Sequence, residues 1–153
     1  MSAEQKLKEL NIELPNVPTP IANFLMWRQV GNLLYLSGQG PRRPDGTIPT
    51  GRLGLNYSVE QGYADARQIG LQILSTVRQA VGSLDKVEAV IKILGMVNAE
   101  PDFKDQPKVI NGCSDVLVEV LGERGKHARS AVGMGSLPNG MPVEIEAIIQ
   151  IKE

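Results

Sequence analysis

The segment that most constrains the fold is HARSAVGMGSLPNGMPVEIEAIIQI, at residues 127–151. Apolar residues recur at every second position from Val143 to Ile151, and a second β-prone stretch precedes Asn139 and Gly140. A period of two is typical of strands with one buried face, and an Asn-Gly pair favours a two-residue hairpin turn. We therefore predict that this segment forms the last two strands of a sheet, paired with each other.

The hairpin register assigns the charged side chains of this segment to one face. A two-residue turn places Gly135 opposite Glu144 and Arg129 opposite Gln150, and opposed residues share a face. The face predicted to meet the helices carries Ser130, Val132, Met134, Val143, Ile145, Ala147, Ile149 and Ile151. The other face carries Arg129, Ala131, Gly133, Gly135, Glu144, Glu146 and Ile148.

Small and apolar residues beside Arg129 and Glu144 indicate a face that another subunit covers. In the predicted register, Arg129 lies six residues along the strand from the partner of Glu144. That separation is roughly 20 Å at about 3.3 Å per residue, so the two side chains should not meet within one chain. We predict an oligomer in which Arg129 of one subunit approaches Glu144 of a neighbour.

Two helices are predicted ahead of this segment. Ser58 and Gln61 match a capping box, apolar residues follow at helical spacing, and Gly82 can end the helix, which predicts a helix over Ser58–Val81. A second apolar stripe with helical period predicts a helix over Asp102–Leu121.

The strand signals complete an α+β arrangement. Phe24–Val30 and Leu33–Ser37 are predicted strands around a two-residue Gly-Asn turn, and Val87–Val97 is a further β-branched strand. Gly38–Asn56 is a long loop, rich in glycine and proline, with room for one short strand. Together with the last two strands, these segments predict a mostly antiparallel six-stranded sheet with both helices on one face.

Residues 1–153 are predicted to form one domain, because the chain is long enough for one hydrophobic core and short for two. Residues 1–19 are interpreted as an N-terminal extension, with helical turns over Ala3–Leu10 followed by an extended, proline-rich arm. No apolar run approaches the roughly 18 to 20 residues of a membrane span, and the N-terminus lacks the apolar core of a signal peptide. We expect no membrane partner and a cytoplasmic location.

Composition argues against several classes of function. A net charge of −1 and an aromatic content of 4% give no basic groove and few stacking surfaces for nucleic acid. The single cysteine, Cys113, and the single histidine, His127, argue against an internal disulfide and a multi-cysteine or multi-histidine metal site. We predict no metal and no cofactor. Cys113 is expected to be a core thiol, and His127 to be structural or exposed.

Two separated segments resemble a known family. LYLSGQGP at residues 34–41 and ARSAVGMGSLPNGMPVEIEAI at residues 128–148 are similar to the signature segments of the Rid (YjgF) family, the reactive intermediate deaminases, also called endoribonuclease L-PSP. The resemblance implies a chorismate-mutase-like fold and homotrimers with clefts between subunits. It also implies hydrolysis of enamines and imines of 2-amino acids to 2-keto acids and ammonia.

The resemblance also implies roles for particular residues. Arg129 matches the arginine that holds the substrate carboxylate, and Glu144 matches the acidic residue near the attacking water. Ser37 and Gly38 match the pair that lines the cleft, and Asn111 matches an asparagine near the start of the second helix. These residue types suit the chemistry, because a guanidinium fits a planar carboxylate and a carboxylate can accept a proton from water.

The sequence departs from the family pattern near the predicted cleft. Phe24, a predicted cleft residue, stands where the best-known deaminases carry a tyrosine, Ala131 replaces a cysteine, and the Gly38–Asn56 loop is longer. Two other functions remain open. A trimeric protein that binds or senses a small carboxylate would use Arg129 without Glu144. An endoribonuclease ranks lower, because the chain has one histidine and no basic groove.

Overall fold

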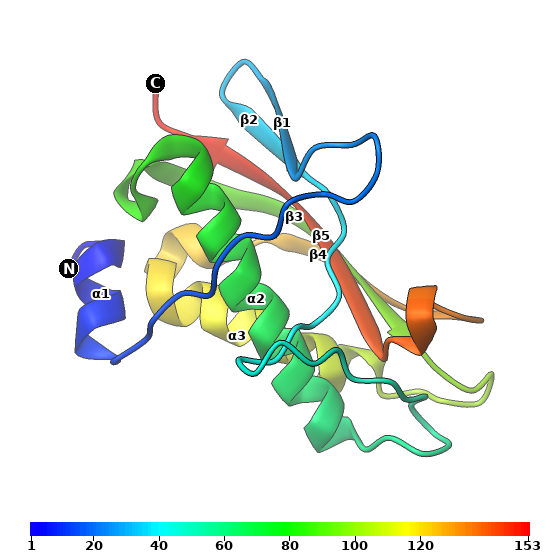
Figure 1. Cartoon of the computed structure of the whole chain (residues 1–153). Helices are drawn as coiled ribbons and strands as arrows, with labels where there is room; N and C mark the ends of the chain where they lie inside the picture. Colours follow the sequence, from blue (N-terminus) through cyan, green and yellow to red (C-terminus); the bar gives the residue numbers. More distant parts are fainter.

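Two long helices cover one face of a five-stranded sheet in the computed structural model, which describes residues 1–153 (Figure 1). The strands are β1 (Trp27–Val30), β2 (Leu33–Leu36), β3 (Val87–Asn98), β4 (Ala128–Met134) and β5 (Val143–Ile151). The α-helices are α1 (Ala3–Glu9), α2 (Val59–Val81) and α3 (Gln106–Leu121). Short 3-10 turns are η1 (Leu84–Lys86), η2 (Gly122–Gly125) and η3 (Pro138–Gly140).

The strands follow the order β1-β2-β5-β3-β4, and only the β3–β4 pair is parallel. The predicted α+β class, with a mostly antiparallel sheet and two helices on one face, is confirmed. The predicted sixth strand is wrong. Residues 38–56 form only isolated bridges, because their many prolines and glycines interrupt a continuous hydrogen-bond ladder.

Local signals placed α2 correctly. Ser58 caps the helix through a capping box with Gln61, and Gly82 ends it in the left-handed conformation with φ 90°. The β1–β2 hairpin also forms as predicted, with Val30 paired to Leu33 across the two-residue turn. None of the helices is long and apolar enough to cross a membrane.

The third helix begins at Gln106 rather than at the predicted Asp102. Pro107 lies in its first turn, where the missing N–H is tolerated. A helix that began four residues earlier would need that N–H as a donor and would press the proline ring against the carbonyl of Phe103. The proline therefore sets the start of α3.

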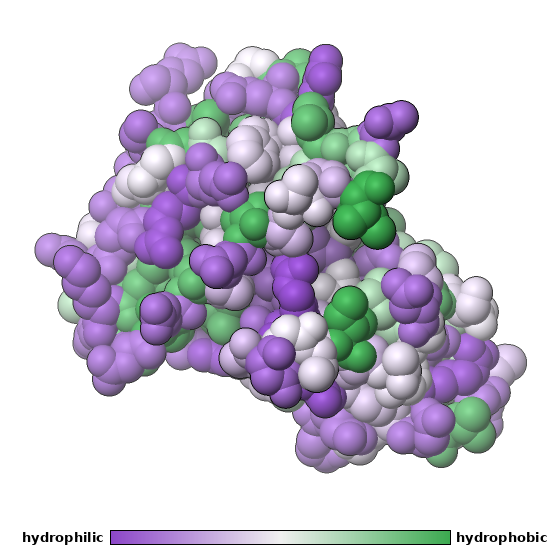
Figure 2. Space-filling view, viewed as in Figure 1, coloured by the Kyte–Doolittle hydropathy of each residue, from purple (hydrophilic) through white to green (hydrophobic).

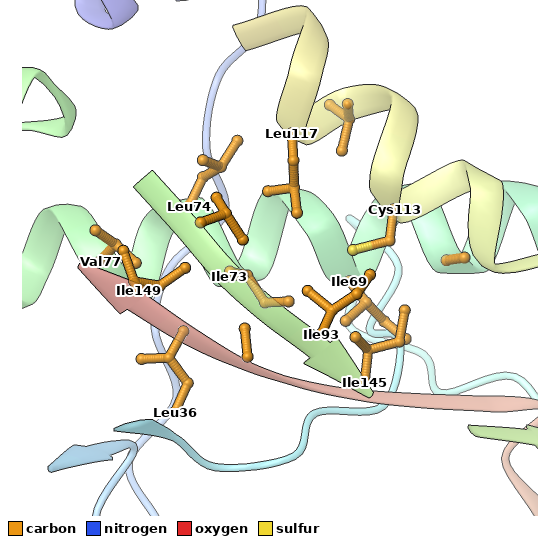
Figure 3. Close-up of a cluster of buried hydrophobic side chains, with 14 of the residues drawn as sticks. Leu36, Ile69, Ile73, Leu74, Val77, Ile93, Cys113, Leu117, Ile145 and Ile149 are labelled. Atoms are coloured by element: carbon orange, nitrogen blue, oxygen red, sulfur yellow. The ribbon is translucent and has the colours of Figure 1, made fainter. Parts of the chain in front are cut away.

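Close packing of α3 against α2 forms the centre of the core. A side chain at Gly112 would collide with the backbone carbonyl of Tyr63, so a residue without Cβ is needed there. Cys113 is fully buried and points toward Ile69 and Ile93, as Figure 3 shows, and burial raises the pKa of its thiol to about 12. The predicted core thiol is confirmed.

The N-terminal residues pack against the rest of the domain. Ala3 and Leu7 of α1 belong to the hydrophobic core, and Glu4 forms an ion pair with Arg78 of α2 over 3.1 Å. The chain that follows α1 then crosses α2, where the Ser75 hydroxyl donates to the carbonyl of Pro15 (Figure 1). The segment interpreted as an extension is thus an integral part of the fold.

The last two strands do not pair with each other, which corrects the predicted hairpin. β3 lies between them, parallel to β4 and antiparallel to β5. Residues 95–99 of the β3 segment are buried, so this stretch is suited to the interior of a sheet rather than to an edge. Because α3 connects β3 to β4, the chain can make the long crossover that a parallel pair requires.

This topology changes the face assigned to Arg129. Arg129 pairs with Ile93, and Ile93 pairs with Ala147, which is buried on the side of the helices. Glu144 instead pairs with Met96, on the face that no helix of this chain covers. The predicted face is therefore right for Glu144 and wrong for Arg129, because the prediction rested on a register that does not form.

Candidate functional site

Arg129 lies on β4, at one edge of the sheet, and its side chain contacts α3. Its Nη1 donates to Oδ1 of Asn111 over 2.8 Å and to Oγ of Ser114 over 3.1 Å. Asn111 and Ser114 are three residues apart and so lie on the same side of the helix. The fold thus brings together two predicted site residues, Arg129 and Asn111, and adds Ser114.

The rest of the Arg129 guanidinium has no protein partner. Its two hydrogen bonds both use Nη1, and none of the ion pairs in the chain involves it. Arg129 is half-buried and has no carboxylate partner, so its charge and its remaining donors are available to an anion. Nε and Nη2 carry the two parallel N–H bonds whose geometry matches a carboxylate.

His127 continues the hydrogen-bond network of Arg129. Its Nδ1 lies 2.6 Å from the carbonyl oxygen of Gly125, and its Nε2 lies 2.9 Å from Oγ of Ser114. A carbonyl only accepts, so the partners assign the proton to Nδ1, and the Ser114 hydroxyl donates to Nε2. Burial, together with the positive charge of Arg129, lowers the pKa of His127 and favours the neutral ring. We call Asn111, Ser114, His127 and Arg129 the Arg129 cluster.

Glu144 lies half-buried on the open face of the sheet, with its carboxylate against Gly38. A side chain at position 38 would collide with Oε2 of Glu144, so the glycine is needed for this approach. Burial and the neighbouring charge of Glu146 raise the pKa of Glu144. A carboxylate with a raised pKa is a better proton acceptor than an ordinary one near neutral pH.

Ser37 and Phe24 lie near Gly38. The Ser37 hydroxyl donates to the carbonyl of Leu25 over 2.5 Å, which commits its one proton to the local backbone. Phe24 is 48% exposed and lines a hollow of about 360 Å³ with Gly38 and Ile48. Figure 2 shows apolar surface over the segment before β1, at the upper right. We call Phe24, Ser37, Gly38 and Glu144 the Glu144 cluster.

The two clusters do not meet within one chain. Arg129 and Glu144 lie on opposite faces of the sheet, and β3 separates β4 from β5. Two strand spacings of about 4.8 Å and three residues of about 3.3 Å put the Cα atoms of Arg129 and Glu144 roughly 14 Å apart. The two side chains therefore do not meet within one chain, as predicted, but the separation is shorter than predicted and arises from the order of the strands and from the opposite faces.

Two arginines of the long loop have structural partners, and the third, Arg42, lines the hollow beside Phe24 and Gly38. Arg52 forms an ion pair with Glu100 over 3.2 Å and donates to Oδ1 of Asn98 over 2.7 Å, which fastens the loop to the end of β3. Arg43 donates to the hydroxyl of Tyr57 over 3.1 Å. No three His, Cys, Asp or Glu side chains gather in a group that could hold a metal ion.

Comparison with known proteins places the chain in a family. A model of the family described as "YjgF/chorismate mutase-like, putative endoribonuclease" matches residues 4–145. The chain belongs to this YjgF family. Protein TCP17 of Trypanosoma cruzi is 40% identical over 95% of this chain and 91% of its own length. A 2-iminobutanoate/2-iminopropanoate deaminase of Dermatophagoides farinae is 30% identical over 92% of this chain and 95% of its own length.

A solved structure supports the fold. A protein of unknown function from Agrobacterium tumefaciens has 42% identity and a TM-score of 0.88, over 99% of this chain and 92% of its own length. The resemblance seen in residues 34–41 and 128–148 is thus confirmed at the level of family and fold. The roles of Arg129 and Glu144 stay predictions.

Proposed function

We propose that the protein is an enamine and imine deaminase that hydrolyses 2-imino acids to 2-keto acids and ammonia. The observation that carries this proposal is the half-buried guanidinium of Arg129, which has neutral acceptors on Nη1 and no carboxylate partner. Membership of the YjgF family and the deaminase-named relative support the same reaction.

The proposed chemistry assigns one task to each charged residue. Arg129 holds the substrate carboxylate through paired N–H donors, which fixes the position of the adjacent C=N carbon. A protonated imine is already electrophilic, and Glu144 accepts a proton from the water that attacks it. A well-placed general base contributes about 10²- to 10⁴-fold to the rate. The products are the keto acid and ammonia.

We further propose that the complete site forms between subunits of a homotrimer. The face of the sheet that carries Glu144 also exposes apolar side chains, with Tyr35 45% and Val132 39% exposed. A hollow of about 420 Å³ on this face is lined by Leu94 and Ile148. Exposed apolar surface of this kind is typical of a protein interface. A neighbouring subunit that docks there could bring its Arg129 to Glu144.

A carboxylate-binding or sensing protein is the second candidate. The Arg129 cluster is complete without Glu144, and Phe24 lacks the hydroxyl that a tyrosine would bring to the cleft. An endoribonuclease is a weaker candidate, because the only histidine already has its two ring nitrogens engaged with Gly125 and Ser114.

Keto-acid release from an enzymatically generated 2-imino acid, together with calorimetric titration of 2-oxobutanoate, tests the proposal. We expect Arg129→Ala to lose both carboxylate binding and rate acceleration. Glu144→Gln should lose most of the acceleration and keep binding, whereas a sensor would bind normally and show no acceleration even before mutation. Arg67→Ala is the matched control, because Arg67 forms an exposed ion pair with Glu119 on the outer side of the helices. Full activity of Arg129→Ala would contradict the proposal.

A further inference from the structure

We propose that His127 and Ser114 are positioning residues, which fix the Arg129 guanidinium in the orientation that receives the substrate carboxylate. The inference rests on the proposed function, because it concerns the same arginine. It assigns a role to two side chains that the expected chemistry leaves unused.

The hydrogen bonds at Nη1 determine the orientation of the guanidinium. Nη1 has two N–H groups, and its two acceptors are Oδ1 of Asn111 and Oγ of Ser114. When both hydrogen bonds are present, the guanidinium cannot rotate without breaking the bond to Asn111 or the bond to Ser114. The opposite edge, with Nε and Nη2, is thereby held in place. Without the Ser114 hydroxyl, only the hydrogen bond to Asn111 would remain, and the guanidinium could rotate about it.

His127 decides whether Ser114 can act as an acceptor for Arg129. A serine in a helix often donates its proton to a backbone carbonyl one turn earlier, which turns its lone pairs elsewhere. Here Nε2 of His127 takes the proton over 2.9 Å, which leaves a lone pair for Nη1 of Arg129. The carbonyl of Gly125 holds the proton of His127 on Nδ1 and so keeps Nε2 free to accept.

The same contacts argue against Ser114 as a nucleophile. A serine nucleophile needs an electron-rich oxygen and a histidine that a third group orients as a base. His127 is oriented by Gly125, but the oxygen of Ser114 already accepts a hydrogen bond from a cation, which withdraws electron density from it. Positioning of Arg129 is therefore the role that these contacts support.

Calorimetry with a charged and a neutral ligand tests this role. We expect Ser114→Ala to weaken binding of 2-oxobutanoate roughly tenfold, the loss typical of one hydrogen bond to a charged group, and to leave binding of the neutral amide 2-oxobutanamide almost unchanged. Ser114→Thr keeps the hydroxyl and should restore binding, whereas His127→Leu should behave like Ser114→Ala. Tyr63→Phe is the control, because it removes a hydrogen bond of 2.6 Å to Asp115 on α3 without touching the Arg129 cluster.

A second measurement is independent of any ligand. His127 is the only histidine, so the ¹⁵N spectrum of histidine-labelled protein reports this ring alone. We expect the proton on Nδ1 at neutral pH, and we expect a crystal structure of Ser114→Ala to show a turned or disordered Arg129 guanidinium. A proton on Nε2, or unchanged 2-oxobutanoate affinity in Ser114→Ala, would overturn the inference.

The two proposals fail in different ways. If the wild-type protein bound no carboxylate, the proposed function would fall, and the tautomer and the crystal structure would decide the positioning role alone. A guanidinium that kept its position in Ser114→Ala would then contradict that role. If the wild-type protein bound 2-oxobutanoate and Ser114→Ala bound it equally well, the function would stand and the inference would fall.

Discussion

At the scale of single residues, the two charged groups of the candidate site are in contrasting surroundings. Arg129 is a permanent cation among neutral hydrogen-bond partners, so its charge remains available to an anion. Glu144 is a half-buried acid whose pKa is raised by burial and by the nearby charge of Glu146. One residue is therefore suited to binding, and the other to proton transfer.

The raised pKa of Glu144 predicts the acidic side of the pH profile. Glu144 must be ionised to accept a proton, so kcat/KM should fall as the pH drops through a pKa above the ordinary value of 4.5. Glu146→Gln removes the like charge and should move this limb to lower pH. The measurement is kcat/KM between pH 4 and 8, with the imine-generating enzyme in excess at each pH. If the acidic limb of the pH profile stayed at the same pH in Glu146→Gln, the charge of Glu146 would not be a cause of the raised pKa of Glu144.

The residue types of the site could be predicted from the sequence, but their partners could not. Arg129, Asn111, Gly38 and Glu144 all belong to the two clusters that the fold assembles. His127 and Ser114 were missed, because each is unremarkable alone. The available signals were the spacing of two between His127 and Arg129 and the spacing of three between Asn111 and Ser114. These spacings predict a shared cluster only when α3 is known to pack beside β4.

At the scale of elements, α3 is the part of the fold that positions the Arg129 cluster. It supplies Asn111 and Ser114, and its place is set by Gly112, where α2 and α3 come into backbone contact. A change in the packing of α2 against α3 at Gly112 should therefore also move the two residues of α3 that hold Arg129.

A methyl group at position 112 tests this coupling. Gly112→Ala places a carbon against the backbone carbonyl of Tyr63, which cannot move aside as a flexible side chain could. We expect the free energy of unfolding to fall by about 1 to 3 kcal/mol in chemical denaturation, together with weaker binding of 2-oxobutanoate. Gly135→Ala is the control, since no atom lies within 4 Å of the added carbon. Equal stability of the two variants would show that the helices have room to separate.

The bounds of α2 could be predicted because its capping residues act locally, and Pro107 is a local signal that would also have placed the start of α3. Strand pairing could not be predicted in this way. Asn139 and Gly140 do adopt positive φ angles of 58° and 68°, as a turn requires. The strands on either side nevertheless pair with β3, because a long apolar strand gains most when both of its edges are covered. A turn signal identifies where the chain reverses and does not identify the neighbour of a strand.

At the scale of the whole molecule, one sheet separates the two halves of the candidate site. The Arg129 cluster lies on the side of α3, and Glu144 lies on the open face, which also exposes Tyr35 and Val132. A single chain therefore cannot place both side chains on one small substrate. The proposed activity requires a neighbouring subunit, and this requirement is the central claim of the proposed mechanism.

Mixing two inactive variants tests that claim most directly. Arg129→Ala and Glu144→Gln subunits, unfolded together in equal amounts and reassembled, should form trimers in which about a quarter of the clefts combine an intact Arg129 with an intact Glu144 from the adjacent subunit. We expect each variant alone to be inactive, and the mixture to recover about a quarter of the wild-type keto-acid release, scaled to the trimer recovered by light scattering. If the mixture stayed as inactive as its parents while trimers formed and exchanged subunits, the two residues would not share a site across the interface.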